Sequence, residues 1–133
     1  MESKKTYQDL FNFSNDAIAF LSNNDSDTKL VYAIKKLVGD KSAGKKGLLA
    51  KVFNAFEERF EDLKLEFAAT DSDGFIIRNE KGEYRFRKDD EKKLNRAFKS
   101  LRTETFIDMP SYIITDYDQT KEYPDSFKGF VIQ

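Results

Sequence analysis

The chain contains neither cysteine nor histidine. Without cysteine, disulfides, thiolate metal sites and a thiol nucleophile are excluded, and the composition suits a reducing cytosol. Without histidine, the side chain that most often acts as general base or zinc ligand near neutral pH is also missing. We therefore expect a non-enzymatic protein that holds no cofactor and no metal.

Long apolar runs and a large net charge are also missing. No run approaches the roughly 20 apolar residues that a membrane span needs, and from the polar start MESKKTYQD we expect no signal peptide. Charged residues make up 35% of the chain but leave a formal charge of -1, which gives no global attraction to nucleic acid or anionic lipid. We expect one cytoplasmic domain, residues 1–133, with no membrane contact.

Phenylalanine is abundant, and the longest regular pattern lies between Gly47 and Ala69. Large apolar residues recur there at alternating steps of four and three, which places them on one stripe of a helix. They are Leu49, Phe53, Phe56, Phe60, Leu63 and Phe67. Burying each side chain is worth roughly 1.5–3 kcal/mol. We expect the stripe to pack on two preceding helices, and a homodimer through residues 48–67 is the alternative.

Two helices are predicted before this stripe, over residues 6–22 and 28–38. In the first, Phe13 and Phe20 lie off the apolar face, which indicates a cover on more than one side. The second is expected to begin after an N-cap at Asp27 or Ser26 and to end at Gly39.

A fourth helix is predicted over residues 88–104, and short strands elsewhere. Residues 75–78 and 84–88 indicate a β-hairpin, and residues 105–109, 112–115 and 129–132 are three further strand candidates. We find no internal repeat. The expected fold class is α+β, with an N-terminal three-helix layer followed by a small, mainly antiparallel sheet that carries one further helix.

Residues 39–46, GDKSAGKK, nearly match the phosphate-binding loop G-x-x-x-x-G-K-[ST]. Lys46 replaces the hydroxyl residue that holds Mg²⁺, and the preceding residues have helical spacing where that motif needs a strand. We interpret the segment as a helix end followed by a flexible connection.

Residues 112–120, YIITDYDQT, resemble the first motif of haloacid-dehalogenase-type phosphatases. The resemblance implies Asp116 as nucleophile and Asp118 as general acid. That family needs most of a parallel sheet downstream of the motif, whereas thirteen residues follow Thr120. We expect a strand that ends in an acidic turn.

Two acidic pairs, Asp25/Asp27 and Asp71/Asp73, invite comparison with calcium loops. Neither pair continues into D-x-[DN]-x-[DN]-G with a glutamate at the twelfth position. We expect both pairs to be helix caps or turns.

A local positive excess lies between residues 85 and 102. Such a patch can bind a phosphate backbone, and the interleaved Tyr84 and Phe86 can stack on bases. Nucleic-acid binding is therefore the alternative function. Its candidate residues are Arg85, Arg87, Lys88, Lys92, Lys93, Arg96 and Lys99.

The order of elements from residue 71 to 109 is familiar. An acidic turn with Gly74 precedes a G-x-Y-x-F hairpin that begins at Gly82, and K-x-L-x-x-x-F-x-x-L follows from Lys92 to Leu101. Together with the upstream VYAI helix, this resembles small uncharacterised proteins encoded by tailed bacteriophages. The resemblance implies a phage product in the host cytoplasm that binds another protein, as a virion assembly component or as an inhibitor of a host or defence factor.

Overall fold

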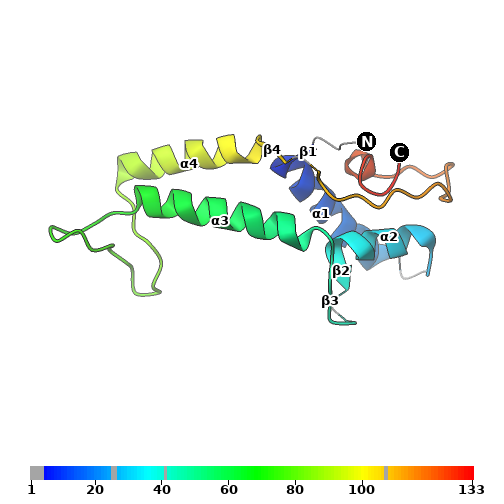
Figure 1. Cartoon of the computed structure of the whole chain (residues 1–133), viewed down its shortest axis with the longest axis horizontal. Helices are drawn as coiled ribbons and strands as arrows, with labels where there is room; N and C mark the ends of the chain where they lie inside the picture. The colour runs from blue at the N-terminus through cyan, green and yellow to red at the C-terminus, as the bar shows by residue number, and fades with distance from the viewer. Residues whose placement is uncertain (1–4, 25–26, 41, 107) are drawn as a thin grey trace. The chain divides into compact units, whose positions relative to one another are not determined.

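The computed structural model describes residues 5–24, 27–40, 42–106 and 108–133. Within these residues the chain forms four α-helices, one 3-10 helix and two two-stranded antiparallel sheets (Figure 1). In chain order they are β1 (Lys5–Thr6), α1 (Tyr7–Asn23), α2 (Lys29–Val38), β2 (Gly39–Asp40), β3 (Lys45–Lys46), α3 (Ala50–Phe67), α4 (Lys88–Arg102), β4 (Thr105–Phe106) and η1 (Asp125–Phe127). The α+β class is confirmed. The expected order is only loosely matched, because three strands precede α3.

The described chain divides into two compact units. Unit 1 contains the described residues up to Phe53 and from Thr105 onward, and unit 2 contains Asn54–Glu104. Helix α3 contributes its first turn to unit 1 and its remaining turns to unit 2. The single domain expected from the sequence stays a prediction.

In unit 1, α1 begins with a capping box. The Thr6 hydroxyl accepts from the backbone N–H of Asp9, and the Asp9 carboxylate accepts from the backbone N–H of Thr6. Phe13, which the sequence places off the apolar face, is fully buried, whereas Ile18 is 58% exposed. The Phe13 ring stacks on Phe130 at 4.5 Å, so the second cover of α1 is the C-terminal segment.

Helix α2 begins at Lys29, one residue later than predicted. Its N-cap is Thr28, whose hydroxyl accepts from the backbone N–H of Val31, so the cap expected at Asp27 is wrong and Ser26 lies outside the described residues. Gly39 ends the helix as expected, with a φ of 95°. Its N–H donates to the carbonyl of Lys35.

The predicted flexible connection after α2 is wrong, because β2 and β3 pair there in an antiparallel ladder. The backbone then returns very close to α2, where Leu49 N–H donates to the carbonyl of Leu37 at 3.0 Å. A Cβ on Gly47 would collide with that carbonyl. The glycines of this segment therefore serve a hairpin packed against a helix end.

The three strand candidates of the C-terminal segment are realised only in part. Residues 105–106 form β4, which pairs with β1, and residue 107 lies outside the described part. Tyr112 N–H donates to the carbonyl of Phe130, and Ile114 N–H to that of Val131, but neither segment forms a regular strand within the described residues. The buried Phe127, Phe130 and Val131 complete the core of unit 1 instead.

In unit 2, α3 and α4 run antiparallel and share an aromatic core. The centre of the Phe98 ring of α4 lies 5.7 Å from the centre of the Phe56 ring and 4.3 Å from that of the Phe60 ring. The apolar stripe of α3 thus packs partly on α4 and, in unit 1, on α1 through the Phe11–Phe53 ring pair. Among the described helices, none has the length and apolar character that a membrane crossing requires.

Candidate functional site

The loop between α3 and α4 contains two turns of the same kind. The Oδ1 atom of Asp71 accepts from the backbone N–H groups of Asp73 and Phe75 at 2.9 and 3.0 Å. Eight residues later, the Oδ1 atom of Asn79 accepts from Lys81 and Glu83 at the same distances. Each turn contains a glycine with positive φ, Gly74 at 85° and Gly82 at 79°. We call residues 69–86 the double-turn loop.

The two turns share a short local pattern in the sequence. The segments TDSDGFII and RNEKGEYR place an Asx residue, a glycine and a following extended stretch at equivalent positions. The signal was present in the sequence as D-x-x-G and N-x-x-G separated by eight residues, because these residue types favour turns.

Three backbone hydrogen bonds close the base of the double-turn loop into a ring. Ala69 N–H donates to the carbonyl of Arg85, Arg85 N–H to that of Ile77, and Ile77 N–H to that of Ala69, at 2.7, 3.0 and 2.9 Å. The predicted β-hairpin over 75–78 and 84–88 is present only in reduced form. The two segments share one isolated antiparallel bridge, Arg78 with Tyr84, and a second bridge joins Ile76 to Thr70.

The ring leaves an apolar tripeptide on the surface. Phe75 is 70% exposed, Ile76 38% and Ile77 37%. The sequence pattern predicts that this run is a strand, and its apolar character predicts that the strand is buried. The turns instead fix the tripeptide on a short loop with too little neighbouring structure to cover it.

Tyr84 and Phe86, considered above as base-stacking residues, are both half-buried. The Tyr84 hydroxyl donates to the Glu61 carboxylate at 2.7 Å, and the Arg78 guanidinium lies 4.5 Å from the centre of the Tyr84 ring. Hydrogen bonds from Lys64 first, and then from Tyr84, hold the pKa of Glu61 below its ordinary value. Tyr84 therefore fastens the double-turn loop to α3, and Arg78 occupies one face of its ring.

All seven candidate nucleic-acid-binding residues are exposed: Arg85, Arg87, Lys88, Lys92, Lys93, Arg96 and Lys99. Within the part of the chain that the structure describes, only Lys93 among them joins an ion pair, at 4.0 Å from Asp90. Arg102 differs, because its guanidinium covers the Phe98 ring at 4.4 Å. The structure thus leaves six of these seven cations with no charge partner in the described chain.

Four of these cations lie on one face of α4. Lys88, Lys92, Arg96 and Lys99 follow each other at steps of four, four and three, opposite the buried Leu94 and Leu101. We call these four residues the cationic stripe.

The segment that resembles the phosphatase motif has a different setting here. Asp116 forms an ion pair with Lys29 at 2.9 Å, and Asp118 Oδ1 accepts from the backbone N–H and hydroxyl of Thr120. The hydrogen bond and charge of Lys29 lower the pKa of Asp116, and the bonds from Thr120 lower that of Asp118. No parallel sheet follows the segment within the described residues.

Asp116 and Asp118 line a cavity of about 430 Å³ in unit 1 whose walls also carry Phe20, Tyr117 and Tyr123. Lys29 and Lys121 balance the two carboxylates. The arrangement gives neither carboxylate a free, activated position, so the acidic turn expected from the sequence describes it better than a nucleophile–acid pair.

Asp71 and Asp73 do not assemble a cation site in the described chain. Asp71 uses its carboxylate to hold a turn, as expected, and Asp25 lies outside the described residues. No group of three or more acidic side chains that could hold a metal occurs among the residues described.

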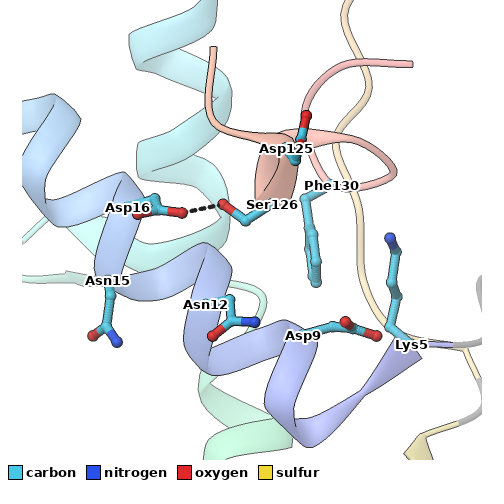
Figure 2. Close-up of a pocket in the computed structure, with 8 residues that line it drawn as sticks. All are labelled: Lys5, Asp9, Asn12, Asn15, Asp16, Asp125, Ser126 and Phe130. Atoms are coloured by element: carbon cyan, nitrogen blue, oxygen red, sulfur yellow. Dashed lines mark hydrogen bonds between the residues drawn. The ribbon is translucent and has the colours of Figure 1, made fainter.

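A second polar cavity of unit 1, about 470 Å³, lies along α1 (Figure 2). Figure 2 shows Ser126 donating to Asp16, a bond of 2.6 Å. The Lys5 ammonium donates to the carbonyl of Lys128, and Asp9 belongs to the capping box. These polar groups already hold the C-terminal segment and the start of α1, so their role is structural.

Comparisons with protein-family models, curated proteins and solved structures found no match to this chain. The resemblance to phage proteins therefore stays a prediction.

Proposed function

We propose that this chain acts by binding another protein and catalyses no reaction. The observation that supports this best is the exposed apolar tripeptide Phe75, Ile76 and Ile77. Exposed apolar patches rimmed by polar residues are typical of interaction sites. Because paired turns and a backbone ring fix the loop, little conformational entropy is lost when a partner covers it.

The setting we propose is that of a phage product in the host cytoplasm. There the protein serves as a virion assembly or morphogenesis component, or as an inhibitor of a host or defence factor. A homodimer through residues 48–67 also stays a prediction, although Phe53 and Phe60 of that stripe already contact aromatic rings of their own chain.

A capture experiment from host lysate tests the proposed surface. The double variant Phe75→Ser, Ile76→Ser is compared with Ile18→Ser, Tyr32→Ser, which removes two apolar side chains of similar mean exposure from unit 1. We expect wild type and the unit 1 variant to retain the same partner and the loop variant to lose it. Equal capture by all three proteins, or capture of no partner, contradicts the proposal.

The absence of catalysis is tested separately in a phosphatase and nucleotidase screen with Mg²⁺. We expect no turnover by wild type. Activity that is lost in Asp116→Asn would make the protein a phosphohydrolase and overturn the proposal.

Nucleic-acid binding is the second candidate function. It is favoured by the exposed cations of residues 85–99, six of which have no ion pair in the described chain. A gel-shift titration over salt concentration tests it, because phosphate contacts weaken as salt rises. Failure to bind any nucleic acid at low salt removes this candidate.

A further inference from the structure

The cationic stripe is a straight row of charge. Lys88 and Lys99 are eleven residues apart, and a rise of 1.5 Å per residue places them about 16 Å apart along α4. The apolar residues Leu94 and Leu101 are buried on the opposite side of α4. The row is therefore presented to solvent on a rigid helix and not on a loop.

Within the described residues, none of the four cations has a carboxylate partner. Asp89, Asp90 and Glu91 lie in the first turn of α4, where they favour the positive end of the helix dipole. Asp90 pairs with Lys93 outside the stripe. The charge of the stripe is thus left for an external polyanion.

The surroundings of the stripe indicate which polyanion fits. An anionic membrane is disfavoured because α4 has no exposed large apolar residue with which to enter lipid. Binding of a single strand depends on rings for successive bases. Tyr84 and Phe98 are both covered by arginines, which leaves the isolated Phe75 as the well-exposed ring of unit 2.

We propose that the cationic stripe binds the phosphate backbone of double-stranded nucleic acid without reading its bases. This inference rests on the second function proposed above. Three of the four residues are lysines, which act as point charges, whereas base reading favours bidentate side chains. The contacts position the duplex and carry no sequence information.

The proposal predicts how strongly the binding constant depends on salt concentration. Neutralising four phosphates of B-form DNA gives a slope of about -3.6 in log K against log salt. We expect a value between roughly -3 and -4, with weak binding at physiological salt, as is usual for sequence-independent contacts.

Fluorescence anisotropy with the full chain tests the proposal. The probes are two 20-base-pair DNA duplexes of unrelated sequence and one single strand of the same length. The test variant is Lys92→Glu, Arg96→Glu, and the matched control is Lys45→Glu, Lys46→Glu, which makes the same charge change at two exposed lysines of β3. If circular dichroism shows that the test variant is unfolded, Lys92→Gln, Arg96→Gln replaces it.

We expect equal binding of both duplexes, weaker binding of the single strand, and a loss of at least about tenfold in the test variant only. Phe75→Ala should leave duplex binding unchanged. Tighter binding of the single strand, a preference for one duplex, or an equal loss in the control variant overturns the duplex inference while nucleic-acid binding stands. Binding of none of the probes at low salt overturns both.

Discussion

Asp71 and Asn79 determine the shape of the double-turn loop, because each side-chain oxygen holds two backbone N–H groups of its own turn. The sequence indicates both turns through their Asx and glycine residues. It does not indicate the ring below them, because hydrogen bonds between residues 69, 77 and 85 depend on how the two turns are placed relative to each other.

Asp71→Ala should therefore loosen the first turn. Each lost hydrogen bond is worth about 0.5–1.5 kcal/mol, so we expect the Phe75 amide to exchange its hydrogen about tenfold faster. Asp73→Ala is the control, since the Asp73 carboxylate makes no hydrogen bond within the described chain. Unchanged exchange at Phe75 in Asp71→Ala would show that the turn does not depend on this side chain.

The Lys29–Asp116 pair gives a prediction about pH. Lys29 lowers the pKa of Asp116, and the same contact raises the pKa of Lys29. The lowered carboxyl pKa stabilises the fold above the unfolded carboxyl pKa, and this contribution is lost as pH falls through the folded value. The raised lysine pKa stabilises it below the unfolded lysine pKa, and this contribution is lost as pH rises through the folded value.

The pair thus acts across neutral pH, although both side chains are largely exposed and the effect on stability is small. We expect NMR titration to give Asp116 a higher pKa in Lys29→Ala than in wild type, and no change in Lys121→Ala. An Asp116 pKa that is the same in wild type and Lys29→Ala contradicts the ion pair.

At the scale of elements, the sequence indicates the four helices well, because each has a periodic apolar face longer than two turns. The strands are indicated poorly. They are two residues long here, and their pairing joins distant residues such as Lys5 and Phe106, which no local pattern can show.

For the candidate site, the exposed cations were predictable from composition, whereas the exposed Phe75 was not, since an apolar run suggests burial.

Phe98 is the aromatic residue through which α4 packs on α3. Because the Phe98 ring is half-buried, Phe98→Ala should cost about 2–3 kcal/mol, below the 3–5 kcal/mol of a fully buried phenylalanine. Phe75→Ala in the same unit should change the free energy of unfolding by less than about 0.5 kcal/mol. Urea denaturation measures both, and equal costs would contradict the packing described.

At the scale of the whole molecule, unit 1 is assembled from both ends of the described chain. Phe127 is fully buried, and its ring contacts those of Phe13 and Phe20 on α1. The sequence gives no sign of this pairing, because the residues involved are more than a hundred positions apart.

Removing residues 125–133 should therefore expose the aromatic face of α1. We expect hydrogen exchange of the α1 and α2 amides to accelerate strongly, because several fully buried side chains leave the core of unit 1 at once. Ser126→Ala, which removes one hydroxyl and keeps the rings, is the control. Unchanged α1 protection in the truncated chain would show that the C-terminal segment is not part of the core.

The backbone ring at Ala69, Ile77 and Arg85 has a consequence for solubility. An exposed apolar run such as Phe-Ile-Ile promotes aggregation mainly when its backbone N–H and C=O groups are unpaired. Another chain can then form hydrogen bonds with these groups as an additional strand. The ring uses both backbone groups of Ile77, and Phe75 exchanges hydrogen bonds with Asp71, so two of the three residues in the run offer no free backbone group to another chain. The loop can thus expose an apolar side-chain cluster while limiting the edge-to-edge strand pairing between chains that leads to aggregation.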